Sequence, residues 1–130
     1  MKILLAEDDE RSARAIAGPL RREGFRVTIA GDGKAALDHL RREPVDVLVT
    51  DWMMPRMDGI SLILRARETV RPVPYIIMVT ALNSEKARAR ALDSGADDFL
   101  TKPVDTRTLL RSIKTGLSRR HQPAPVVRAR

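Results

Sequence analysis

The carboxylate of Asp51 stands at the end of a short apolar run and carries the chemistry that the sequence suggests. The run VDVLVTD, residues Val45–Asp51, is rich in β-branched residues, which is typical of a strand buried on both faces of a parallel sheet. Pro55 and the pair Asp58-Gly59 then indicate a loop. Asp51 is therefore expected at the carboxyl end of a central strand, where open α/β sheets bind ligands. A lone Asp at a strand end is often only a turn residue. A functional role for Asp51 therefore depends on which other groups reach the same edge.

An acidic run, EDDE, follows the apolar stretch KILLA near the amino terminus. Its last two residues, Asp9 and Glu10, are of the type that caps a helix. Its first two, Glu7 and Asp8, directly follow the predicted strand and are expected to face Asp51. Three carboxylates at one edge repel unless a cation lies between them. With no Cys and only two His, neither at this edge, the ligands would all be oxygen, which favours Mg²⁺ or Mn²⁺.

Two further polar residues are predicted at the same edge. Thr80 ends the run YIIMVT, and Lys102 follows the short run DFLT. Taken alone, such a Thr is more often a strand-end hydroxyl, and a lone Lys is more often a solvated charge. Pro103, however, fixes the turn after Lys102 and would aim its ammonium back into the site. A metal, a carboxylate, a hydroxyl and an ammonium together suit phosphoryl transfer to Asp51.

The composition fits one soluble domain. The chain has 130 residues, of which 43% are hydrophobic and 32% charged. The absence of Cys excludes disulfides, and no apolar run approaches the roughly 20 residues needed to span a bilayer. The first ten residues lack the pattern of a signal peptide. We therefore expect a cytoplasmic protein without membrane contact.

The net charge of +7 is unevenly distributed. Residues 119–130 hold four Arg and no acid, which leaves 20 basic and 17 acidic groups for residues 1–118. The chain also has few aromatic residues on which bases could stack. We therefore expect no direct nucleic-acid binding by this domain. The segment 119–130, with two Pro and no period, is predicted to be a disordered basic tail or linker.

Hydrophobic periodicity predicts five strands that alternate with five helices. The predicted strands are Lys2–Ala6, Arg26–Ala30, Val45–Thr50, Tyr75–Thr80 and Asp98–Thr101. The predicted helices are 11–22, 34–42, 59–68, 84–94 and 105–118, the fourth with Ser84 as N-cap and with Ala87, Ala91 and Leu92 inward. This alternation implies an α/β fold, a three-layer flavodoxin-like (βα)5 sandwich with a parallel five-stranded sheet in the order 2-1-3-4-5. That order brings the carboxyl ends of strands 1, 3, 4 and 5 together.

Over Met1–Leu117 the chain resembles the receiver (phospho-acceptor) domain of two-component response regulators. The resemblance rests on ILLAEDDE, DWMMPRMDG, VTA and GADDFLTKP, in this order and at matching distances. It implies that Asp51 is the phosphoacceptor. It also implies that Asp8, Asp51 and the backbone carbonyl of Met53 bind the metal, with Glu7 acting through a water. Many receivers carry two Asp where this chain has Glu7-Asp8, although Glu-Asp also occurs.

The resemblance further implies the roles of the switch residues. Thr80 and Lys102 are expected to contact the phosphoryl oxygens. Phe99 is expected at the aromatic position that turns inward on activation, where the commoner Tyr would add a hydroxyl. Met53 and Leu82, two residues after Asp51 and Thr80, are expected to cover the phosphoryl group as an apolar lid. The bland interpretation of both is packing against neighbouring loops.

The resemblance implies a signalling switch and not a turnover enzyme. Such a switch catalyses only its own phosphorylation and dephosphorylation. The phosphoryl group would come from a histidine kinase or histidine phosphotransferase. The surface of the fourth helix, fifth strand and fifth helix would then signal to a downstream effector or output domain. The winged-helix class dimerises through this surface, but Thr108 and Ser112 stand where that class usually has an acid and an Arg. We therefore expect a monomer, and at most a weak dimer after phosphorylation.

Two other functions fit these residues less well. A metal-dependent phosphatase with an Asp nucleophile usually has a second Asp two residues later, and that position is Met53. A purely structural interaction domain would not need the full set of Asp8, Asp51, Thr80 and Lys102. Residues 1–118 are thus expected to form the receiver domain, whether it stands alone or belongs to a longer regulator.

Overall fold

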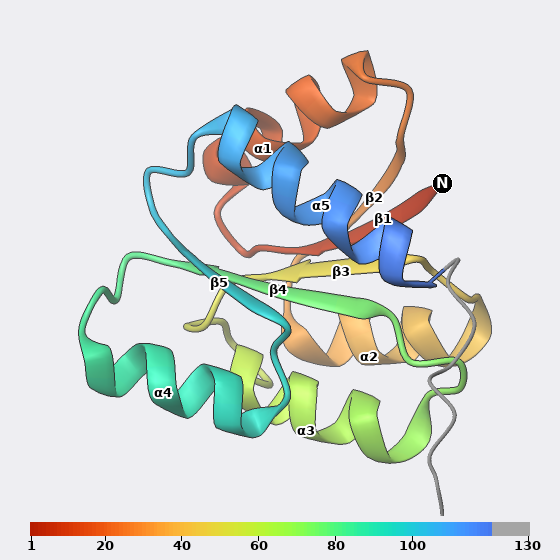
Figure 1. The fold of residues 1–130 in the computed structure, drawn as a ribbon. Coiled ribbons are helices and arrows are strands. Elements are labelled where there is room, and N and C mark those ends of the chain that lie inside the picture. Colours follow the sequence, from red (N-terminus) through yellow and green to blue (C-terminus); the bar gives the residue numbers. More distant parts are fainter. Residues whose placement is uncertain (121–130) are drawn as a thin grey trace, which may run out of the picture.

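The sheet has five parallel strands in the order β2-β1-β3-β4-β5, as the sequence predicts (Figure 1). The computed structural model describes residues 1–120. The strands are β1 (Lys2–Ala6), β2 (Arg26–Ala30), β3 (Val47–Thr50), β4 (Tyr75–Thr80) and β5 (Asp98–Thr101). The helices are α1 (Glu10–Arg22), α2 (Gly33–Arg42), α3 (Gly59–Thr69), α4 (Glu85–Ser94) and α5 (Thr106–Arg120). Within residues 1–120, no helix is long and apolar enough to cross a bilayer.

Two helices cover one face of the sheet and three cover the other. Helices α1 and α5 lie on one side, and α2, α3 and α4 lie on the opposite side (Figure 1). Side chains of β1 alternate between the two cores, because successive strand residues point to opposite faces. Leu4 belongs to the core under α2 and α3, whereas Ile3 and Leu5 belong to the core under α1 and α5. Because both faces are covered, β3 and β4 are buried at every position.

All five helices begin at a polar side chain that caps them. The capping residues Asp9, Asp32, Asp58, Ser84 and Asp105 each accept a hydrogen bond from the backbone N–H three residues further on. This satisfies one of the N–H groups that the first helical turn leaves free. The capping roles expected for Asp9 and Ser84 are therefore confirmed.

The structure corrects one predicted contact of α4. Ala91 is fully buried and Ala87 partly buried, but Leu92, predicted to face inward, is 36% exposed. Adjacent helix residues lie about 100° apart around the axis, so Leu92 cannot share the narrow stripe through Ala87 and Ala91. The boundaries of all ten helices and strands agree with the prediction to within two residues. Helix α5 continues to Arg120, and the rest of the predicted tail, 121–130, lies outside the described residues.

Helix α5 is fixed to the sheet by Tyr75 and Asp98. Gly116 lies against the aromatic ring, where an added Cβ would come within 2.3 Å of the Tyr75 side chain. The hydroxyl of Ser112 donates to Asp98 Oδ2 at 2.6 Å and also hydrogen-bonds the Tyr75 side chain. The guanidinium carbon of Arg119, near the end of α5, lies 6.0 Å from the centroid of the same ring. The inner face of α5 is therefore fully engaged.

Candidate functional site

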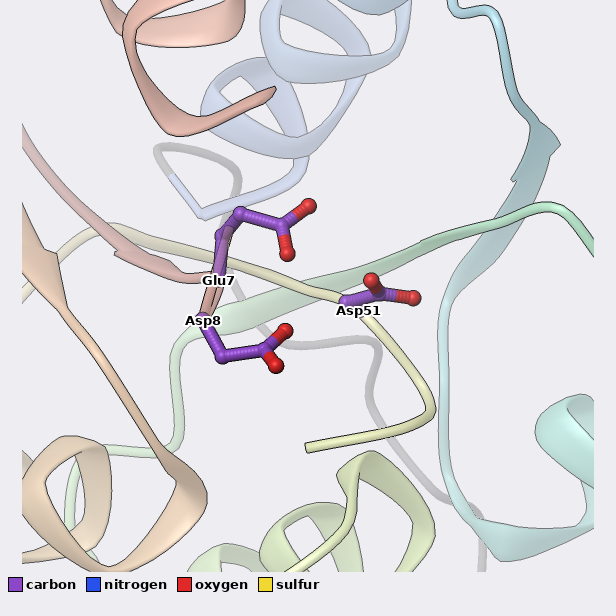
Figure 2. Close-up of side chains that lie close together, drawn as sticks. All are labelled: Glu7, Asp8 and Asp51. Carbon is purple, nitrogen blue, oxygen red and sulfur yellow. The ribbon is translucent and has the colours of Figure 1, made fainter. Parts of the chain in front are cut away.

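Three carboxylates converge at the carboxyl edge of the sheet. One oxygen from each of Glu7, Asp8 and Asp51 lies within 4.8 Å of the other two, and Figure 2 shows the three side chains around a common space. The strand register explains this convergence. Ala6 of β1 pairs with Thr50 of β3, so the residues that follow each strand emerge at the same level.

The ammonium of Lys102 enters this acidic cluster from the end of β5. Its Nζ contacts Glu7 Oε1 and lies 2.9 Å from Asp51 Oδ2. The backbone N–H of Lys102 donates to Thr80 O at 2.8 Å, and the Lys102-Pro103 peptide bond is cis. Lys102 therefore points back toward the three acids, as the sequence predicts.

The three acids differ in exposure. Glu7 is 3% exposed, Asp51 is half-buried, and Asp8 is exposed. Burial raises the pKa of the Glu7 carboxyl, and the charge of Asp51 adds to this, whereas Lys102 and the Asp9 N–H act in the opposite direction. Burial alone would lower the pKa of Lys102, but its hydrogen bonds to Glu7 and Asp51 and their charges outweigh burial and raise it. The ammonium therefore stays charged, and one of the three negative charges is balanced from within the chain.

The side chain and the backbone of Asp51 are both held in place. Its Oδ1 accepts a hydrogen bond from the Trp52 N–H at 2.6 Å, which leaves Oδ2 toward Lys102. The Gly59 N–H donates to Trp52 O at 2.7 Å, and a Cβ at Gly59 would lie 2.1 Å from Asp51 O. Only glycine therefore permits this approach of α3 to the main-chain carbonyl of Asp51.

An ion pair holds the β3–α3 loop, and the sequence analysis did not anticipate it. Arg56 Nε lies 2.9 Å from Asp32 Oδ2, and Arg56 adopts a φ of 67°, which is uncommon for a residue with a side chain. Beside this pair, a Cβ at Gly33 would lie 2.1 Å from Met57 O. The same loop carries Met53. No local pattern in the sequence links Asp32 to Arg56, because the contact depends on how α2 and the loop pack.

The structure places the other predicted site residues around this cluster. Thr80 is buried, and its Oγ1 accepts a hydrogen bond from the Leu82 N–H at 3.3 Å rather than contacting an acid. Phe99 is 6% exposed and already packs into the core under α3 and α4. Met53 and Leu82 are 66% and 42% exposed. Glu7, Asp8, Asp51 and Lys102 thus form the assembled part of the site.

The carboxylate cluster fits a divalent cation that prefers oxygen ligands. Glu7, Asp8 and Asp51 supply only carboxylate oxygens, and Lys102 balances one of their three charges. Hard cations such as Mg²⁺ and Mn²⁺ are bound by one or two carboxylates together with backbone carbonyls and waters. Among the described residues this is the group of acids whose oxygens lie close enough to hold one ion.

The chain is similar to known proteins over most of its length. Residues 3–114 match the family described as the response regulator receiver domain. The sensory transduction protein RegX3 of Mycolicibacterium smegmatis is 41% identical over 119 residues, covering 90% of this chain and 50% of that protein. The transcriptional regulatory protein CpxR of Escherichia coli K12 is 42% identical over 120 residues, covering 92% and 50%. The chain therefore spans about half the length of the curated relatives it matches.

Solved structures agree with these matches. The receiver domain of a Francisella response regulator superposes with a TM-score of 0.86 at 38% identity, covering 92% of this chain and 98% of that one. The receiver domain of a sensor histidine kinase from Pseudomonas aeruginosa PAO1 superposes with a TM-score of 0.82 at 34% identity, covering 90% and 97%. That second structure holds a magnesium ion coordinated in its active-site cleft.

We predict that Mg²⁺ raises the melting temperature of this protein at constant ionic strength. A ligand that binds only the folded state stabilises it by about 1.4 kcal/mol at ten times its dissociation constant. Asp8→Asn should abolish most of this shift without lowering the metal-free melting temperature, because it removes one of three like charges. Asp93→Asn, an exposed acid on α4, is the matched control and should respond like the wild type. An equal response in Asp8→Asn, or none in the wild type, would refute the metal site.

Proposed function

This chain belongs to the family of response regulator receiver domains, and we propose that Asp51 accepts the phosphoryl group. The proposal rests on the observation that, of the three clustered acids, Asp51 alone is both accessible to a phosphodonor and paired with the Lys102 ammonium. Glu7 contacts Lys102 but is 3% exposed, so a phosphodonor cannot reach it. Asp8 is exposed and forms no ion pair with any described residue, whereas Asp51 is half-buried with Lys102 at 2.9 Å.

The proposed reaction transfers a phosphoryl group from a phosphorylated histidine to Asp51. A carboxylate oxygen of Asp51 attacks phosphorus and forms a P–O bond, while the P–N bond breaks and its electron pair stays on the departing imidazole. The Trp52 N–H fixes Oδ1, so the carboxylate is oriented before the donor arrives. Lys102 would then pass from the Asp51 carboxylate to the oxygens of the transferred group, where negative charge is spread.

We further propose that Asp8, Asp51 and the Met53 carbonyl bind Mg²⁺ or Mn²⁺, with Glu7 acting through a water. The contact of Glu7 with Lys102 supports an indirect role, because that side chain is already buried and paired. A bound Mg²⁺ would supply positive charge next to the phosphoryl oxygens. In this scheme the chain is a signalling switch that catalyses only its own phosphorylation and dephosphorylation.

Replacing Asp51 by Asn tests this assignment. The variant should fold, because Asn is nearly isosteric, its amide oxygen can still accept from the Trp52 N–H, and the repulsion from Glu7 and Asp8 falls. After incubation with Mg²⁺ and acetyl phosphate, the wild type should gain the mass of one phosphate and the variant none. Circular dichroism establishes that the variant is folded. If Asp51→Asn gains phosphate as readily as the wild type, the acceptor has been misassigned.

The partners of the whole protein follow from the same proposal. A histidine kinase or histidine phosphotransferase would donate the phosphoryl group, and a downstream effector or output domain would respond. Phosphorylation would draw the Thr80 hydroxyl away from the Leu82 N–H toward a phosphoryl oxygen. Phe99 already lies inward in this structure, so the proposed switch begins at Thr80 and repacks the surface of α4, β5 and α5.

We predict that the protein stays monomeric without phosphate and forms at most a weak dimer with it. The two acids of β5 and the turn before it, which could pair with a second copy, are engaged within the chain. Asp98 accepts from Ser112, and Asp97 accepts from Arg67 and from the Ile76 N–H. Light scattering in Mg²⁺, with and without acetyl phosphate, should give the mass of one chain or a small concentration-dependent rise. A tight dimer that appears only with acetyl phosphate would contradict this.

We also predict that phospho-Asp51 decays slowly, because Met53 and Leu82 would cover it. Both side chains are largely exposed, so they are not packed into neighbouring loops and are free to lie over a phosphoryl group. Neither can orient or deprotonate a water in line with phosphorus. The double change Met53→Asn, Leu82→Glu should accelerate phosphate loss by up to about 100-fold, the lower end of what a positioned general base contributes.

The rate is measured as loss of phosphate in Mg²⁺ buffer after the donor is removed. The matched control is Leu64→Asn, Leu92→Glu, which makes the same kind of change at two exposed apolar residues outside the site. The control should decay like the wild type. Equal rates for all three proteins would exclude a lid function for Met53 and Leu82.

A further inference from the structure

The entire net charge of this protein lies at its carboxyl-terminal end. Residues 106–130 hold seven of the 24 basic residues and none of the 17 acidic ones, so residues 1–105 are neutral with 17 of each. The helix boundaries show that the excess begins at the first residue of α5.

Three cations of α5 form a stripe along its outer face. Arg107, Arg111 and Lys114, here the α5 stripe, follow one another at intervals of four and three residues and therefore project from the same side of the helix. All three side chains are exposed, and within residues 1–120 none forms an ion pair with an acid. Thr115 and Ser118 add hydroxyl groups beside them. Together they line an open surface hollow of about 780 Å³.

We propose that the α5 stripe binds the sugar–phosphate backbone of duplex DNA without reading its sequence. The face offers unpaired cations and hydroxyls, which are the groups that most often contact DNA phosphates. Within residues 1–120, Leu110 is the only apolar residue that lines the hollow, whereas a stable protein interface has an apolar core. From Arg107 to Ser118 the helix rises about 16 Å, enough to follow several phosphates along one strand. The face therefore suits a polyanion better than a folded partner.

This proposal departs from the expectation that the domain does not contact nucleic acid, and it does not depend on phosphorylation of Asp51. The stripe lies on the layer of α1 and α5, and its residues make no contact with the acidic cluster. Arg119 is left out of the stripe because it lies over the Tyr75 ring. Asp51→Asn should bind DNA as the wild type does, so the two proposals can fail separately.

The test measures binding of the full chain to a short fluorescent duplex by anisotropy at several salt concentrations. The stripe variant carries Arg107→Gln, Arg111→Gln and Lys114→Gln. The matched control carries Lys34→Gln, Arg65→Gln and Arg90→Gln, three exposed cations on α2, α3 and α4. Both variants lose two Arg and one Lys, so they have the same net charge and differ only in the layer that loses it (Figure 1).

We expect the wild type to bind two duplexes of unrelated sequence equally, with a dissociation constant of about 10⁻⁴–10⁻⁶ M at physiological salt. Three phosphate contacts contribute about −2.7 to the slope of log K against log salt. This slope corresponds to a loss of affinity of about 40-fold when the salt concentration rises from about 50 to about 200 mM. The stripe variant should lose this part of the slope, and the control should keep it.

Three results would overturn the proposal. Equal weakening in both variants would show that net charge alone attracts DNA. Undiminished binding by the stripe variant would place the contact elsewhere in the chain. Competition by poly-glutamate at a lower concentration than by unlabelled duplex would show that the stripe prefers an acidic polypeptide.

Discussion

The ammonium of Lys102 joins three strands at the edge where the chemistry takes place. It contacts Glu7 after β1 and Asp51 after β3, although these residues lie 95 and 51 positions away in the sequence. Without this cation the edge would gather three carboxylates with no positive charge among them. A buried carboxylate such as that of Glu7 is tolerated only when it is paired and hydrogen-bonded. This contact therefore ties the end of β5 to the ends of β1 and β3, in addition to the pairing of β5 with β4.

The carboxyl edge of the sheet and the layer of α1 and α5 carry different functional groups. The carboxyl edge, with the loops after β1, β3, β4 and β5, holds the groups that suit phosphoryl transfer. The layer of α1 and α5 instead carries the excess of positive charge on its outside and the Tyr75, Ser112 and Asp98 contacts on its inside. Asp98 of β5 accepts a hydrogen bond from Ser112 of α5, so this strand and this helix are joined directly.

The features that the sequence predicts are those that depend on neighbouring residues. Buried apolar runs, punctuated by Gly and Pro, define β1 to β5, and the alternation with helices defines the sheet order. Because strand ends converge in such a sheet, Glu7, Asp8, Asp51 and Lys102 could be placed together in advance. Contacts that depend on the packing of separate elements could not be foreseen. These include the Arg56–Asp32 ion pair and the packing of α5 on Tyr75.

The two glycines beside the acidic edge restrict how this protein could be redesigned. Gly59 faces the carbonyl oxygen of Asp51, and Gly33 faces that of Met57, each at a distance that no Cβ could occupy. Both obstacles are main-chain atoms, so a rotamer change cannot relieve them. A library that varies this loop to alter metal choice or phosphate lifetime should keep both codons fixed and place its diversity at Met53, Met54 and Leu82.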